Sequence, residues 1–392
     1  MKTSVSRIIS DHAKVAEVDR VLHVLWLVDH LGHGGFLHGA GRYYMNVLPR
    51  FNPSTVATTL CVLRRQDAAT EMFEKEGIRV RHLGRGKFDP RTLADVARLV
   101  RRDNVDLIHA HGYGSNNIAR LVGSAYRVPV IIHSHDDDRN YPWYQRIADM
   151  ILCRLTSRAV AVSHAVQISL INKRRVPSIR TCVLHNAIPL EQFVEPDPAV
   201  VNRERTRLRI SAETKVVGAV GRLREEKGMR FLIEAVPVVL KRFPDALFLI
   251  VGDGPLRADL ERLASRLNIA DKVRFAGFRK DVQVMLSIID IVVVPSLTEG
   301  FGLALLEAMA LRKPIIASNV SAIPEIITDG YNCLLAPPGD PDAIAKKIIN
   351  LLESEDERRR LATNAFQSAQ YYGANAHVRK LEQIYRRTLF SV

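Results

Sequence analysis

Cysteine, aromatic residues and long apolar runs are scarce in this sequence. Its four cysteines lie far apart and form no CxxC pair, which argues against a disulfide framework and fits reduced thiols in a cytoplasmic protein. No run of roughly eighteen apolar residues occurs, so we expect no membrane-spanning helix. Charged residues interrupt every apolar run in the first twenty positions and leave no signal-peptide core, so we interpret residues 1–19 as a flexible tail.

Acidic residues are also in deficit. The 42 Asp and Glu are outnumbered by 56 Lys and Arg, and the net charge of +14 favours contact with phosphate groups or an anionic surface. Aromatic residues make up 6% and the cations are scattered, which argues against a nucleic-acid groove. The apolar (47%) and charged (25%) fractions are those of folded soluble proteins, and at roughly 150 residues per domain the chain predicts two or three domains.

Short β-branched runs alternate with helical periodicity along almost the whole chain. This alternation predicts an α/β fold in which helices cover both faces of parallel sheets. In the first half, strands are expected at 21–28, 55–63, 78–83, 106–110, 129–133, 158–162 and 181–184. In the second half they are expected at 215–220, 246–251, 272–275, 289–294, 313–317 and 331–335. Residues 186–200 contain three prolines and no sustained periodicity, which indicates a linker between two doubly wound domains that would enclose a ligand cleft.

The loop after the strand at 215–220 reads GRLREEKG and carries Gly221, Arg222 and Lys227. In a strand-to-helix loop, glycine lets the backbone approach a ligand and the helix N-terminus offers unpaired N–H groups. Two cations beside them would neutralise a diphosphate. The alternative is that both cations are solvated loop residues.

A second glycine-rich loop, PSLTEGFGL, follows the strand at 289–294 and contains Glu299, with Glu307 in the helix behind it. Glu307 lies about five residues into that helix, roughly 7.5 Å along its axis. If the helix start holds phosphate, Glu307 can reach a ribose diol on one side while Glu299 reaches a sugar on the other, because a carboxylate accepts two hydroxyl hydrogen bonds. The alternative for Glu307 is a favourable acidic residue near a helix start.

Together, these strings resemble the family-4 retaining glycosyltransferases. In the second half the similarity rests on GRLREEKG, VGDGP (251–255), VRFAGF (273–278), PSLTEGFGLALLEAMA (295–310) and PGDPDAIA (338–345). In the first half it rests on DLIHAHG, VPVIIHSHD, AVSHAV and HNAIPLEQF, so it covers nearly the whole chain. The resemblance implies a GT-B fold with an acceptor-side Rossmann-like domain at 20–190 and a donor-binding domain at 191–372. It further implies that a helix at 373–392 packs back on the first domain.

The resemblance also implies roles for individual residues. Arg222 and Lys227 match the pair that neutralises the donor diphosphate, and Glu299 and Glu307 match the two ends of the EX7E motif. His133 matches the cleft histidine after the fifth strand. The remaining positions match segments that border the donor: Gly34, Gly35, Gly221, Gly254, Phe278, Arg279, Gly300, Phe301, Gly302 and Leu303. The sequence departs from the family in a lengthened glycine loop at 34–42 and in Asn186-Ala187 where Asn-Gly is usual, which leaves the acceptor contacts open.

Histidines gather after strands one, four and five of the first half. If the strand order is 3-2-1-4-5, His30, His33, His38, His109, His111, His133 and His135 converge on one side of the cleft. A metal site with Asp136, Asp137 and Asp138 is an alternative to contact with phosphate or acceptor, and His109 or His111 are alternatively packing residues. Because the resemblance is to metal-independent enzymes, we expect no required metal or cofactor.

The sequence therefore predicts a retaining, metal-independent transferase that moves a hexose or N-acetylhexosamine from a nucleotide diphosphate sugar to an acceptor hydroxyl. A UDP-sugar is favoured as donor and GDP-mannose comes next, with a glycan, a lipid-linked or a small-molecule acceptor in cell-surface polysaccharide or glycolipid assembly. The expected location is cytoplasmic, with possible peripheral contact to an anionic membrane. The alternatives are a nucleotide-sugar epimerase, a soluble sugar-phosphate glycosyl synthase or a non-catalytic nucleotide-sugar sensor.

Overall fold

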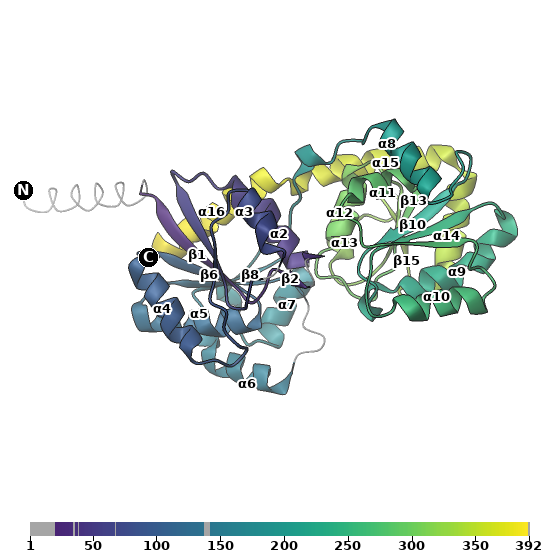
Figure 1. The fold of residues 1–392 in the computed structure, drawn as a ribbon. Helices are drawn as coiled ribbons and strands as arrows, with labels where there is room; N and C mark the ends of the chain where they lie inside the picture. Colours follow the sequence, from purple (N-terminus) through teal and green to yellow (C-terminus); the bar gives the residue numbers. More distant parts are fainter. Residues whose placement is uncertain (1–19, 34–35, 38, 67, 137–141, 391–392) are drawn as a thin grey trace, which may run out of the picture. The chain divides into compact units, whose positions relative to one another are not determined.

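The computed structural model describes residues 20–33, 36–37, 39–66, 68–136 and 142–390, and the chain forms two compact units (Figure 1). Unit 1 consists of Met1–Asn186 together with Ala374–Val392, and unit 2 consists of Ala187–Gly373. The chain therefore passes between the units twice. Both passages lie within a few residues of the predicted boundaries after 190 and after 372.

Unit 1 is built on a seven-stranded parallel sheet. Its strands are β1 (Leu22–Val28), β4 (Val56–Val62), β5 (Val80–His82), β6 (Leu107–His111), β7 (Val130–Ser134), β8 (Arg158–Ala161) and β9 (Thr181–Val183). The order β5-β4-β1-β6-β7-β8-β9 contains the predicted 3-2-1-4-5 arrangement. The sequence of β1, LHVLWLV, is nearly uninterrupted in its apolar character and nearly all buried, as expected of a strand covered on both faces. A short antiparallel pair, β2 (Gly32–His33) and β3 (Phe36–Leu37), follows β1.

Helices cover both faces of this sheet. They are α2 (Gly39–Val47), α3 (Thr70–Lys75), α4 (Arg91–Arg102), α5 (Tyr113–Tyr126), α6 (Trp143–Leu152), α7 (His164–Asn172) and α16 (Ala374–Phe390), with the 3-10 turns η1 (Leu48–Arg50), η2 (Cys153–Leu155) and η3 (Ser178–Arg180). On one face, α2, α3 and α16 bury a core around Trp26 and Tyr385. The C-terminal helix, yellow in Figure 1, thus belongs to unit 1.

Unit 2 has a six-stranded parallel sheet in the order β12-β11-β10-β13-β14-β15. Its strands are β10 (Val216–Val220), β11 (Leu247–Val251), β12 (Val273–Gly277), β13 (Ile291–Val294), β14 (Ile315–Ser318) and β15 (Leu334–Ala336). Its helices are α8 (Pro198–Arg207), α9 (Met229–Arg242), α10 (Arg257–Arg266), α11 (Val282–Ile288), α12 (Leu303–Ala310), α13 (Ile323–Ile326), α14 (Pro341–Glu353) and α15 (Glu355–Ala369). The strand order reverses between β10 and β13, and ligands of such sheets bind beyond the carboxyl ends of strands at this reversal.

The predicted linker at 186–200 is partly helical. Asp197 accepts a hydrogen bond from the N–H of Ala199 and Pro198 occupies the first position of α8, so the prolines that suggested a linker also start a helix. Among the described residues, no helix combines the length and the apolar character that crossing a membrane requires.

Candidate active site

The loop after β10 is held in place by close backbone packing. The N–H of Gly221 donates to the carbonyl of Val251 over 2.9 Å. Gly228 has a φ of +61°, and a Cβ atom added there would lie 1.9 Å from the carbonyl oxygen of Pro295. Only glycine meets both conditions, so Gly228 lets the loop after β10 and the loop after β13 touch.

The third loop of this site follows β11 and packs on the first. Leu223 donates its N–H to the carbonyl of Asp253 over 3.0 Å, and a Cβ atom at Gly254 would meet the Leu223 carbonyl oxygen at 2.5 Å. Gly254 therefore has a packing role as well as its predicted place beside the donor. The three loops converge at the carboxyl ends of β10, β11 and β13.

Lys227 and Glu299 form an ion pair across two of these loops. Lys227 Nζ lies 2.8 Å from Glu299 Oε1 and 2.7 Å from Oε2. The hydroxyl of Ser296 donates to Glu299 Oε2 over 3.1 Å, and the N–H of Leu297 donates to the carbonyl of Glu226 over 2.9 Å. The side chains of Lys227 and Glu299 are 22% and 11% exposed, so the pair is accessible to a ligand.

Arg222 is much less constrained than Lys227. Its side chain is 51% exposed, and its guanidinium approaches the Glu226 carboxylate only to 3.9 Å. Such a pair between exposed side chains contributes little to stability. Arg222 is thus a charged side chain that can move toward an anionic ligand at little energetic cost.

The segment Gly300–Leu303 leads into α12. Gly302 has a φ of +94° and precedes the helix, which has no side-chain hydrogen bond capping its N-terminus. Phe301 is buried, with its ring centroid 5.7 Å from that of Tyr372. Glu307 is 1% exposed within α12. Backbone N–H groups and a buried carboxylate therefore stand at one helix start, an arrangement suited to a phosphate and its neighbouring hydroxyls.

The two residues expected near a nucleotide base behave differently. Phe278, which follows β12, is 40% exposed. Arg279 forms ion pairs with two carboxylates: its guanidinium lies 2.5 Å from Asp281 and 3.1 Å from Glu204 of α8. These two acidic neighbours, Asp281 first, raise the pKa of Arg279. Phe278 is thus partly exposed to solvent, whereas the Arg279 guanidinium is held by two carboxylates at the turn.

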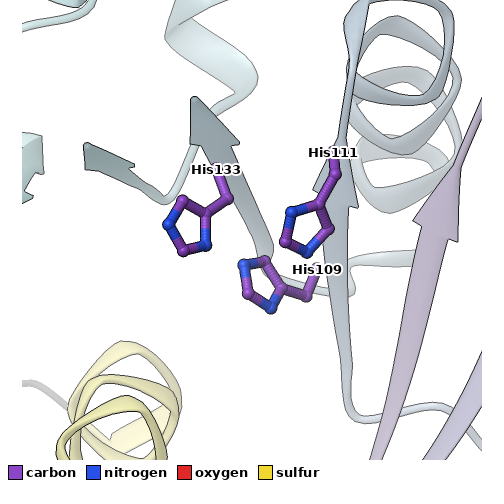
Figure 2. A group of neighbouring side chains, drawn as sticks. All are labelled: His109, His111 and His133. Carbon is purple, nitrogen blue, oxygen red and sulfur yellow. The ribbon is translucent and has the colours of Figure 1, made fainter. Parts of the chain in front are cut away.

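In unit 1, histidines gather in the interior. His109 and His111 of β6 and His133 of β7 are each at most 1% exposed (Figure 2). His135 is half-buried at the end of β7, and its ring stacks on that of His133 at 4.6 Å. Burial lowers the pKa of His109, His111 and His133 well below 6.5, with neighbouring histidines adding to the effect, so all three rings are neutral at pH 7. His133, predicted as the catalytic cleft histidine, is buried, and the more exposed His135 stacks on its ring.

Hydrogen bonds to this cluster come from distant parts of the chain. Tyr385 of α16 lies 2.7 Å from His109 Nδ1, and His135 Nε2 lies 3.0 Å from His111 Nδ1. Tyr43 bonds to His377 of α16 over 2.9 Å. No local pattern points to Tyr385 or His377, because α16, which follows the whole of unit 2, brings Tyr385 to β6 and His377 to α2.

His109, His111 and His133 are also the residues that could hold a metal ion. Their ligand nitrogens lie within 4.8 Å of one another, and no other described group of three His, Cys, Asp or Glu residues does so. A tetrahedral zinc site has Zn–N distances of about 2.0–2.1 Å. The rings of His109 and His133 are stacked with an interplanar angle of 14°, so metal binding would require them to turn toward a common point.

Some predicted site residues fall outside the described part of the chain. Gly34, Gly35, His38, Asp137 and Asp138 are among them, so these parts of the lengthened glycine loop and of the aspartate run lie outside the described residues. Residues that the sequence did not single out include Asp29, whose carboxylate accepts hydrogen bonds from the N–H groups of Gly114 and Ser115 at the start of α5.

Comparison with known proteins gives this site its context. Two family models match the chain, one described as Glycosyl transferases group 1 over residues 200–368 and one as Glycosyltransferase Family 4 over residues 37–192. The chain is 30% identical over 307 residues to the alpha-D-kanosaminyltransferase of Streptomyces kanamyceticus, an alignment that covers 73% of this chain and 78% of the relative. The chain belongs to the family-4 glycosyltransferases.

Other relatives of this family-4 glycosyltransferase differ in their substrates. The D-inositol 3-phosphate glycosyltransferase of Corynebacterium glutamicum is 28% identical, with 73% of each chain covered. The UDP-Gal:alpha-D-GlcNAc-diphosphoundecaprenol alpha-1,3-galactosyltransferase of Escherichia coli is 24% identical, with 68% of this chain and 71% of the relative covered. The crystal structure of Anabaena HepE in complex with UDP matches with a TM-score of 0.81 at 22% identity and covers 93% of this chain and 99% of that one. The fold is therefore GT-B, as the sequence predicted.

Proposed function

We propose that this family-4 glycosyltransferase transfers a hexose or N-acetylhexosamine from a nucleotide diphosphate sugar to an acceptor hydroxyl with retention of anomeric configuration. The observation that carries the proposal is the Lys227–Glu299 pair at the meeting point of three glycine-rich loops, with the half-exposed Arg222 on the same loop as Lys227. A diphosphate entering there meets two cations and the N-terminus of α12.

In this proposal the two cations act on the leaving group. As the bond from the sugar C1 to the diphosphate oxygen breaks, negative charge grows on the diphosphate, and Arg222 and Lys227 stabilise it without a metal. Glu299 holds Lys227 in position before the donor arrives and then accepts hydrogen bonds from sugar hydroxyls. Glu307 accepts hydrogen bonds from the ribose, and N–H groups of residues 300–303 face the phosphates.

We propose a front-face route for the transfer itself. The acceptor oxygen bonds to C1 on the side that the diphosphate leaves, and the acceptor proton passes to a departing phosphate oxygen, so no enzymic nucleophile is needed. We further propose that His133 takes part in the reaction, as the family resemblance implies; it is buried, and the half-buried His135 stacks on its ring. Loss of the His133 ring should lower turnover less than loss of Lys227.

For the substrates, a UDP-sugar is the favoured donor and GDP-mannose the next. HepE was crystallised with UDP-glucose, and the name of the E. coli relative gives UDP-Gal as donor and a diphosphoundecaprenol-linked acceptor. We propose an acceptor in cell-surface polysaccharide or glycolipid assembly and peripheral contact with an anionic membrane. Basic residues of unit 1 that the sequence offers for this contact are Arg64, Arg65, Arg85, Lys87, Arg91, Lys173 and Arg175; Arg174, between the last two, is buried and does not contribute.

The test begins with thermal stabilisation by UDP, GDP and ADP and continues with sugar nucleotides of the best base. We expect UDP to raise the melting temperature most, and NMR of the product to show the anomeric configuration of the donor. A product of inverted configuration, or a sugar released as its epimer without any acceptor, would contradict the proposal. Assays with and without EDTA test independence from metal.

A further inference from the structure

Helix α6 of unit 1 buries its acidic residue and exposes its large apolar side chains, which is the reverse of an ordinary surface helix. Its acidic residue, Asp149, is 2% exposed and forms an ion pair with the fully buried Arg120 of α5. Its large apolar side chains face solvent instead: Trp143 is 72% exposed, Ile151 69% and Met150 62%. Exposed apolar side chains are ordinary when scattered, but a contiguous group marks an interaction site.

Four of these side chains lie on one side of α6, and exposed apolar residues of two other segments lie next to residues that contact α6 or the turn after it. Positions 143, 147, 150 and 151 have the spacing of a single helix side. Phe88, 79% exposed, extends the surface at the start of α6, where Lys87 Nζ lies 5.4 Å from the Phe88 ring and 5.8 Å from that of Tyr144. At the other end, Arg180 donates to the carbonyls of Arg154 and Thr156, which brings the 85% exposed Ile179 alongside.

We call this surface the α6 face. Its apolar members are Phe88, Trp143, Ile147, Met150, Ile151 and Ile179.

Cations border the α6 face, and the chain that follows α6 carries no acidic residue until Glu191. Lys87, Arg146 and Arg154 are exposed beside the apolar side chains. Residues 150–190 contain six Lys and Arg and no Asp or Glu. The face therefore has an apolar centre, two aromatic rings from Phe88 and Trp143, and a positive border, which is the composition of a surface that lies in a membrane interface.

We propose that the α6 face inserts into the headgroup region of an anionic bilayer. The inference rests on the proposed membrane contact and deepens it by naming the surface that makes it. Apolar side chains would leave water while the bordering cations meet anionic headgroups. A second copy of the chain is disfavoured as the occupant, because a two-fold contact would set the same cations against one another.

The experiment measures sedimentation of the full chain with vesicles of mixed phosphatidylcholine and phosphatidylglycerol, and with phosphatidylcholine vesicles alone. The test variant is Trp143→Gln/Ile151→Gln, which changes two exposed positions. The control, Val194→Gln/Tyr371→Gln, removes two similarly exposed apolar side chains from unit 2, which are 67% and 82% exposed. We expect the ratio of vesicle-bound to free protein to fall about tenfold or more in the test variant. The control variant should bind as the parent does.

A second readout is the emission of Trp143. Only two tryptophans are present, and Trp26 is fully buried, so a blue shift on adding anionic vesicles reports Trp143 entering the bilayer. Transfer to a soluble acceptor should be equal in the parent and both variants. This measurement keeps a failure of the proposed transferase activity separate from a failure of the membrane inference.

Three outcomes of these experiments would contradict the proposal. Binding to anionic vesicles that is unchanged in the test variant, with no shift of Trp143 emission, overturns the role of the α6 face and leaves membrane contact through another surface. If the parent protein does not bind anionic vesicles, both the proposed membrane contact and the role of the α6 face are wrong. A parent dimer that the test variant converts to monomer, without vesicle binding, identifies the face as an interface between copies and overturns the proposal.

Discussion

The two units place polar side chains at the carboxyl ends of their parallel strands in opposite ways. In unit 2, Lys227 and Glu299 are charged, paired and reachable from solvent. In unit 1, His111 and His133 end or nearly end their strands but are buried and neutral. A pair of opposite charges remains ionised where water still reaches it. An imidazole can be buried because it loses its proton and becomes neutral. The same position in a sheet thus holds a partly exposed ion pair in one unit and core side chains in the other.

The largest expected effect lies on the charged side of this comparison. Lys227→Ala removes a cation that the leaving diphosphate needs, and we expect turnover to fall about 10²-fold or more, as for loss of one preorganised electrostatic donor. Arg230→Ala is the control, since it removes a cation paired with Glu234 on the exposed side of α9. Steady-state kinetics check the prediction. If Lys227→Ala and Arg230→Ala both stay within threefold of the parent, the assignment of Lys227 is wrong.

A smaller effect is expected where two loops of unit 2 touch. Gly228→Ala places a Cβ atom 1.9 Å from the Pro295 carbonyl oxygen at a φ of +61°, whereas Gly84→Ala has a φ of +65° and no atom within 4 Å. The backbone strain of about 1–2 kcal/mol is common to both variants. We expect the clash to cost Gly228→Ala about 2 kcal/mol more and to weaken nucleotide binding. Urea unfolding and UDP binding measure the two costs, and equal stabilities would contradict the packing argument.

The smallest effect expected from a single residue is the pH dependence that each buried histidine gives to the free energy of unfolding of unit 1. Their pKa values are lowered in the folded chain, with that of His377 at about 4, so between pH 6.5 and the folded pKa the unfolded chain binds protons that the folded chain does not. The free energy of unfolding of unit 1 should therefore fall as pH falls, by about 1.4 kcal/mol per pH unit for each such histidine. Above pH 6.5 these groups contribute no pH dependence.

Trp26 reports this transition because its ring lies 4.6 Å from His109 and 4.7 Å from His111. In Trp143→Phe it is the sole tryptophan, and we expect the urea midpoint of its fluorescence to drop between pH 6.5 and about 5, above the ordinary pKa of carboxylates. Asp29 opposes the trend, since burial raises its pKa and its protonation favours the folded chain. A midpoint that does not change over this range would mean that the histidines are solvated or already charged.

Patterns within one segment were predictable from the sequence, and pairings between distant segments were not. The strand order, the glycine-rich loops and the candidates Arg222, Lys227, Glu299 and Glu307 follow from local pattern and family resemblance. That Glu299 holds Lys227 with both carboxylate oxygens is a contact over 72 residues and required the fold. Spacing also shows which residues of α6 share a side but not which side is buried, because the partner of Asp149 lies in another helix.

The last helix carries a consequence for the order of synthesis. Unit 1 is interrupted by the whole of unit 2, and its residues Ala374–Val392 are synthesised after unit 2. Until they do, His109 lacks Tyr385, Tyr43 lacks His377, and the core beside Trp26 is open. Unit 2 is one continuous segment and can complete its fold first. A premature stop within α16 should therefore leave a finished nucleotide-binding half attached to an unfinished partner, a product recognisable to proteases by its open core.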